Sequence, residues 1–136
     1  MIIYIDENMS PILARGFNLL QSPLNKRNKL DIEVRSIKDE FREGVPDEEW
    51  IPDAGKQQAC IITQDYNIKR MKHQKALCEK YNLGMFYFRP PSKKGFTYWD
   101  MVTLIVKHWQ KIAKKASKEK KPFAYKITSR GEMQEL

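Results

Sequence analysis

The chain has 136 residues, 41% of them hydrophobic, which predicts one folded domain and excludes an intrinsically disordered chain. No apolar run approaches the roughly 18 residues of a membrane-spanning helix, so no membrane partner is expected. The formal net charge of +8 favours a polyanionic partner such as nucleic acid.

Two further features concern the cellular setting. The N-terminal sequence MIIYIDEN lacks the basic start and the small-residue cleavage site of a signal peptide. The only cysteines, Cys60 and Cys78, do not form a metal-type pair and are expected to be buried apolar residues. The expected compartment is therefore the cytoplasm.

Strand and helix signals alternate along the chain. Short apolar runs predict strands at residues 1–5, 32–37, 60–63, 85–88 and 123–127. Helices are expected to begin at Ser10, at Asp47, after Asp65 and at Thr97, with a polar loop at residues 21–30. This order predicts an α/β fold with a mainly parallel sheet of four to five strands. The domain is expected to span residues 1–128, followed by a flexible tail at residues 129–136.

Acidic residues follow the predicted strands. Asp6 and Glu7 come directly after the first strand, Asp65 comes directly after the third, and Asp47 opens the helix after the second. Ligands of open α/β sheets bind beyond the carboxyl ends of the strands. Neighbouring carboxylates disfavour one another's ionisation, and a divalent cation relieves that cost. Oxygen ligands without a His or Cys cluster favour Mg²⁺ or Mn²⁺, which could support phosphodiester hydrolysis.

Each acidic residue also has a purely structural interpretation. Asp6 could simply end a strand, Asp47 could be only a helix N-cap, and Asp65 could begin a turn. Glu7 could be a solvated turn residue. The Thr63 hydroxyl could support a carboxylate, or Thr63 could be only a strand residue.

Three motifs occur in an order that is similar to a known family. IDEN at residues 5–8, GVPDEEW at 44–50 and IITQD at 61–65 resemble the PIN-like nuclease family, specifically its compact toxin-like branch. The resemblance spans about residues 1–90 and implies a Rossmann-like α/β/α sandwich. Carried over by position, the metal-binding and catalytic carboxylates would be Asp6, Asp47 and Asp65, with Glu7 as a weaker metal ligand.

The resemblance also implies a function. Many such domains are Mg²⁺-dependent ribonucleases, so this chain is expected to be a Mg²⁺- or Mn²⁺-dependent endoribonuclease and the toxin of a type II toxin–antitoxin pair. Its expected partners are RNA, a cognate antitoxin protein and a second copy of the chain.

Two alternatives stay open. One is a catalytically inert nucleic-acid- or partner-binding module on the same fold. The other is a receiver-like phosphoacceptor domain, which would need a lysine where FYFRPP at residues 86–91 has Arg89, and which leaves Asp47 unexplained.

Basic residues supply candidate RNA contacts. Lys69, Arg70 and Lys72 come shortly after Asp65, and Arg89 leaves the fourth strand at the same sheet edge. These four residues are the predicted RNA-binding set. A lysine stripe follows helical spacing later in the chain at Lys107, Lys111, Lys114 and Lys118. It could track a phosphate backbone or form an ordinary solvated helix face.

Overall fold

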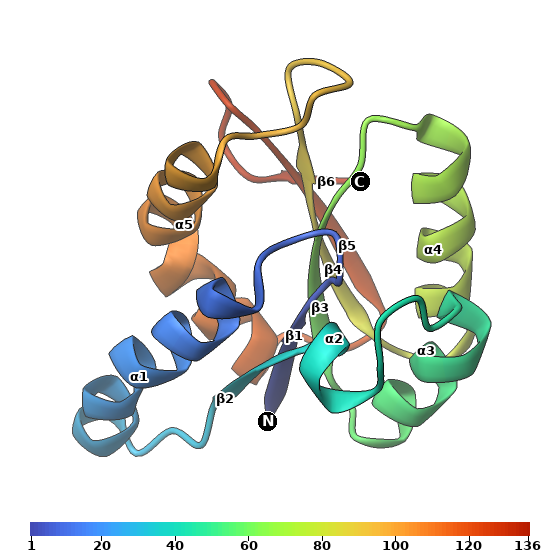
Figure 1. The fold of residues 1–136 in the computed structure, drawn as a ribbon. Helices are drawn as coiled ribbons and strands as arrows, with labels where there is room; N and C mark the ends of the chain where they lie inside the picture. The colour runs from blue at the N-terminus through green and yellow to red at the C-terminus, as the bar shows by residue number, and fades with distance from the viewer.

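Six strands form one sheet at the centre of the structure, a computed structural model that describes residues 1–136 (Figure 1). The strands are β1 (Ile2–Ile5), β2 (Glu33–Ser36), β3 (Cys60–Gln64), β4 (Gly84–Arg89), β5 (Phe123–Thr128) and β6 (Gln134–Glu135). They lie in the order β2-β1-β3-β4-β5-β6. All neighbouring pairs are parallel except β5 and β6.

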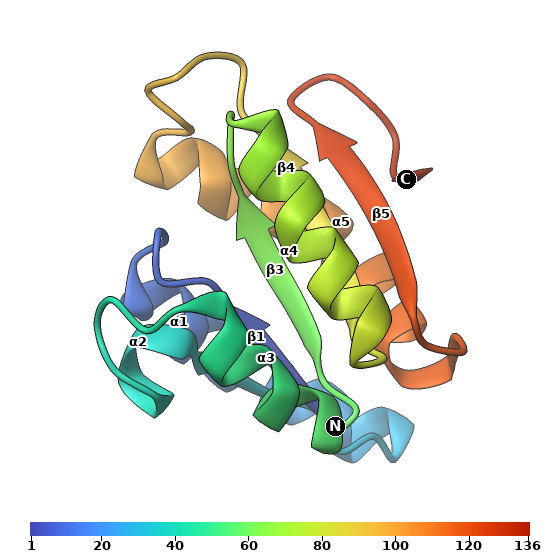
Figure 2. The same ribbon diagram turned by 90° about the vertical axis from the view of Figure 1, so that its right-hand side faces the viewer.

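Helices cover both faces of the sheet. They are α1 (Pro11–Asn28), α2 (Ile37–Glu40), α3 (Asp47–Lys56), α4 (Ile68–Lys80) and α5 (Tyr98–Lys118). Helices α1 and α5 pack on one face, and α3 and α4 pack on the other (Figures 1 and 2). The predicted α/β/α sandwich with a mainly parallel sheet is therefore confirmed. None of these helices combines the length and apolarity needed to cross a bilayer.

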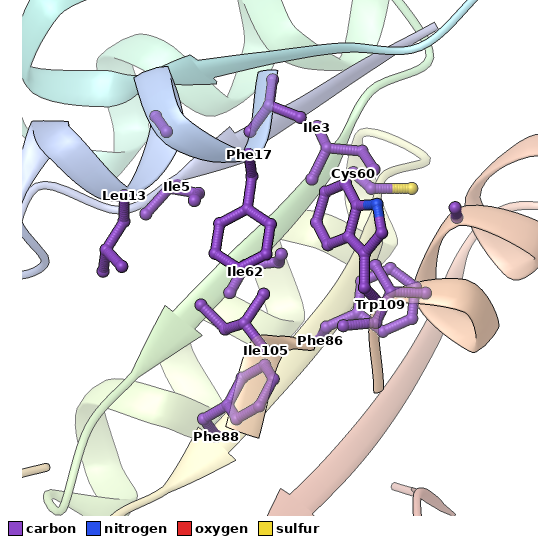
Figure 3. Packing of buried hydrophobic residues seen from close by; sticks show 14 of the residues in the cluster. Ile3, Ile5, Leu13, Phe17, Cys60, Ile62, Phe86, Phe88, Ile105 and Trp109 are labelled. Carbon is purple, nitrogen blue, oxygen red and sulfur yellow. The ribbon is translucent and has the colours of Figure 1, made fainter. Parts of the chain in front are cut away.

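The core explains why the central strands are apolar along their whole length. Side chains alternate between the faces of a strand, so β1 directs Ile3 and Ile5 towards α1 and α5 and Tyr4 towards α3 and α4. Figure 3 shows Phe17 of α1 and Trp109 of α5 meeting above the strands, with ring centroids 4.9 Å apart. Each fully buried side chain of this size stabilises the fold by about 1.5–3 kcal/mol.

Helix α1 is longer than its sequence predicts. The polar composition of residues 21–30 predicts a loop, but the helix continues through Pro23. Gln21 is fully buried, and its Oε1 accepts a hydrogen bond from Nε1 of Trp109 at 2.8 Å. This contact with α5 anchors a polar stretch that its local sequence would not keep helical.

The end of the chain also differs from the prediction. Instead of forming a flexible tail throughout residues 129–136, the chain turns back and adds β6 to the sheet. The backbone N–H of Leu136 donates to the carbonyl of Ala124 at 2.9 Å. The returning segment thus pairs with part of the β5 edge, which would otherwise present unpaired backbone groups.

Candidate functional site

The connections of the sheet leave an opening between β1 and β3. Helix α1 connects β1 to β2 over one face of the sheet. Helix α3 connects β2 to β3 over the other face, and β3 lies on the opposite side of β1 from β2. Neither connection covers the carboxyl ends of β1 and β3, which is where open α/β sheets bind ligands. A cleft of about 1250 Å³ lies at this edge. All four predicted acidic residues line it, namely Asp6, Glu7, Asp47 and Asp65.

Asp6 is the most buried of these acids, with 8% of its surface exposed. Its Oδ2 accepts hydrogen bonds from Oγ1 of Thr63 at 2.6 Å and from Nε2 of Gln74 at 3.3 Å. Its Oδ1 accepts from the backbone N–H of Glu7 at 2.8 Å. Burial raises the pKa of Asp6, the hydrogen bond from Thr63 opposes that rise, and the negative charge of Asp47 adds to it. Of the two interpretations left open for Thr63, the structure shows the one in which its hydroxyl bonds to a carboxylate.

Asp47 is the second half of an acidic pair. It begins α3, and its Oδ1 accepts a hydrogen bond from Nε1 of Trp50, a side chain in the core, at 3.0 Å. Burial raises the pKa of Asp47, while Trp50 and Gln74 partly offset the rise. Gln74 therefore faces both carboxylates. Burial raises the pKa of both acids, so each favours its protonated form. The helix continues through Pro52.

Asp65 points to a basic partner instead. Nε of Arg70 donates to its Oδ2 at 2.9 Å, and Nη2 donates to its Oδ1 at 3.2 Å. Oδ1 also accepts from the backbone N–H of Asn67 at 2.8 Å, which fixes the turn into α4. The Tyr87 hydroxyl donates to the Asp65 carbonyl. Asp65 thus lines the same cleft as Asp6, but its carboxylate is hydrogen-bonded to Arg70.

Glu7 fixes the wall of the cleft. Its Oε2 accepts a hydrogen bond from the backbone N–H of Gly44 at 2.7 Å. Gly44 has φ of 76°, a conformation that other residues rarely adopt. This bond ties the end of β1 to the loop that leads into α3, so Glu7 helps to place Asp47 beside Asp6.

The predicted RNA-binding residues are divided by the structure. Lys69 and Arg70 line the cleft, whereas Lys72 and Arg89 do not. The Arg89 guanidinium lies over the ring of Tyr66 at 5.3 Å and donates to the Tyr87 hydroxyl at 3.5 Å. Lys93, in the segment between β4 and α5, adds a further positive charge to the lining.

The donor set of the cleft has the chemistry of a hard-cation site. Its lining holds four carboxylates and the amide oxygen of Asn8, which suits Mg²⁺ or Mn²⁺ better than a thiophilic metal. Burial opposes ionisation of Asp6 and Asp47, a cost that a cation would offset. No three Asp, Glu, His or Cys side chains are grouped to hold an ion as they stand. The third predicted catalytic acid of the cleft, Asp65, has its carboxylate bonded to Arg70.

Comparison with models of protein families finds a match over residues 1–90, to the PIN-like domain. The chain belongs to the PIN-like family. PIN-like domains are commonly nucleases, so the chain has a nuclease-type fold. Neither the curated proteins nor the solved structures gave a match.

In this PIN-like domain, the matched region contains every acidic residue of the cleft. It includes β1 to β4 and the helices between them. Helix α5 and β5 lie beyond the match but complete the same fold, because α5 supplies much of one core layer and β5 pairs with β4.

Two features of this PIN-like cleft escaped the sequence analysis. Gln74 is buried on α4 with Met71 and Cys78, and this spacing places a polar residue on an apolar helix face. A buried amide needs hydrogen-bond partners, so that pattern was a usable signal. The second feature is a contact between Nε2 of His73 and Oε1 of Glu48 at 2.5 Å. It joins α4 to α3, and no local sequence pattern indicates it.

Proposed function

We propose that this PIN-like domain is a metal-dependent endoribonuclease. The observation that carries the proposal is the convergence of Asp6, Asp47 and Asp65 on one polar cleft, from positions up to 59 residues apart in the sequence. The family supports a nuclease, and the excess of positive charge supports a nucleic-acid substrate.

Six residues of the cleft have distinct roles in this proposal. Asp6 and Asp47 would hold Mg²⁺ or Mn²⁺, Asp65 would complete the ligand set, and Glu7 would keep the first two together. The ion would supply an activated water and would stabilise charge at the cleaved phosphate. Lys69 and Arg70 lie on the first turn of α4, where they can bind the phosphate groups of the substrate.

The proposed biological setting is a type II toxin–antitoxin pair, with an antitoxin protein as the partner of the domain. Its support is the resemblance of the IDEN, GVPDEEW and IITQD motifs to the compact toxin-like branch. A catalytically inert binding module is the second candidate. The bond between Arg70 and Asp65 favours it, because that bond occupies a carboxylate that the nuclease needs.

The test of the proposed function is cleavage of a structured RNA by the purified protein. We expect cleavage with added Mn²⁺ or Mg²⁺ and none with a chelator, because only a bound ion offsets the charge of the acidic pair. Separated RNA fragments on a denaturing gel give the readout. Cleavage that survives chelation would contradict the metal mechanism, and RNA binding without cleavage would favour the inert module.

A second expectation concerns the surface that binds RNA. Replacing Lys69, Arg70 and Lys72 by Ala should reduce the slope of log affinity against log salt by about two, since each phosphate contact to a single strand contributes about 0.7. Fluorescence anisotropy with a labelled RNA at several salt concentrations measures this slope.

The matched control is the lysine stripe on α5. Replacing Lys107, Lys111 and Lys114 by Ala removes the same charge from a helix whose exposed lysines lie outside the cleft. We expect a smaller change in slope from this variant. A larger change there would move the RNA surface from the cleft to α5.

A further inference from the structure

The bond between Arg70 and Asp65 decides whether the third carboxylate is available. Both guanidinium nitrogens that face Asp65 are engaged, so the pair has the two-pronged geometry that arginine uses for carboxylates and phosphates alike. A phosphate group can therefore replace the carboxylate on the same face of the guanidinium.

The pair is also placed to open. The Arg70 side chain is 73% exposed, whereas that of Asp65 is 20% exposed. An ion pair so open to solvent holds its partner only weakly, by about a twofold to fivefold preference. Arg70 can turn towards a ligand in the cleft without disturbing the core, and the Asp65 carboxylate, which lines the same cleft as Asp6 and Asp47, is then free of its partner.

We propose that Arg70 is a positioning residue that exchanges Asp65 for a phosphate group of the substrate. The exchange frees Asp65 for the metal ion, so phosphate and metal bind cooperatively. This inference rests on the proposed function and deepens it, because it makes the complete metal site depend on the presence of substrate. Coupling of two ligands is reciprocal, so each ligand should strengthen binding of the other.

The first test needs no metal. Asp65→Asn removes the charge that holds Arg70, so adenosine monophosphate should bind the metal-free variant about twofold to fivefold more tightly than it binds the wild type. Asp47→Asn is the matched control, because it removes the same charge from the same cleft and leaves the Arg70 pair intact. Calorimetric titration gives both affinities. An equal gain in the two variants would overturn the exchange, because it would show a general effect of charge.

The second test measures Mn²⁺ binding, and cleavage plays no part in the readout. Arg70→Gln should bind Mn²⁺ about twofold to fivefold more tightly than the wild type, because Asp65 is then free. Lys69→Gln, which removes a positive charge from the same cleft, should change the affinity less. Arg70→Lys should lie between the wild type and Arg70→Gln, because lysine keeps the charge without the two-pronged geometry.

Adding adenosine monophosphate to these titrations completes the cycle. It should raise the Mn²⁺ affinity of the wild type more than that of Arg70→Gln, once Mn²⁺ bound to free nucleotide is subtracted. An equal rise in both proteins would overturn the proposal, because phosphate would then act on the metal directly. RNA cleavage without this coupling would refute only the exchange, whereas coupling without cleavage would refute the proposed nuclease.

Discussion

Asp6→Asn and Asp65→Asn are each expected to lower Mn²⁺-dependent RNA cleavage by about two orders of magnitude or more. Asparagine keeps the shape of the side chain but removes the charge that would hold the ion. Losing even half of a metal contribution of several kcal/mol produces a rate decrease of that size. Initial rates of cleavage at the same fixed Mn²⁺ concentration for every variant measure the effect.

Asp53→Asn provides the control for this loss. Asp53 lies on the exposed side of α3 and does not line the cleft, so the same chemical change there should leave the cleavage rate within about twofold of wild type. If Asp6→Asn and Asp53→Asn cleave RNA at similar rates, the acidic cleft is not the catalytic site.

The pH dependence of stability supplies a further check on Asp6. Burial raises its pKa above the ordinary value of 3.8, so ionisation costs more in the folded protein than in the unfolded chain. The contribution of Asp6 to the free energy of unfolding of the metal-free wild type therefore falls as the pH rises from about 3.8 through the folded pKa. Metal-free Asp6→Asn should consequently melt at or above the wild-type temperature at pH 7, and this advantage should vanish in acid.

Gln74→Met is expected to lower the free energy of unfolding by about 1–3 kcal/mol at neutral pH. Methionine fills a similar volume, but it removes the amide that donates to Oδ2 of Asp6 at 3.3 Å and that faces Asp47. The buried carboxylate of Asp6 then lacks one of its hydrogen-bond donors. Urea unfolding of metal-free protein, followed by circular dichroism, measures the change.

The sign of the pH effect separates this mechanism from a packing defect. The Gln74 hydrogen bond lowers the pKa of Asp6, so its loss raises the folded pKa further. The destabilisation should therefore be complete at neutral pH and should shrink as the pH falls and Asp6 becomes protonated. Gln110→Met, on the exposed side of α5, should change stability little at any pH. A loss in Gln74→Met that does not vary with pH would mean that Gln74 acts through packing alone.

The sequence by itself determined the fold class and the edge of the sheet where the acids gather. Apolar runs buried on both faces identify central parallel strands, and Ser10-Pro11 and Thr97 mark helix starts through local hydrogen bonding. Asp6 and Asp65 directly follow strands that run in the same direction. Neighbouring parallel strands have their carboxyl ends at the same edge of the sheet, so these two acids had to share that edge. These sequence signals depend only on residues that are close together in the chain.

Only the tertiary structure decided what each acid contacts. Gln21 keeps α1 helical through a bond to Trp109, 88 residues away, and Gln74 reaches Asp6 across 68 residues. Asp65 and Arg70 lie only five residues apart, yet their contact also depends on the tertiary structure. The orientation of α4 fixes where its first turn, which carries Arg70, points. Hydrogen bonds and ion pairs depend on distances of a few tenths of an ångström between side chains. Those distances are set by how helices pack on the sheet, which the spacing of residues along the chain does not specify.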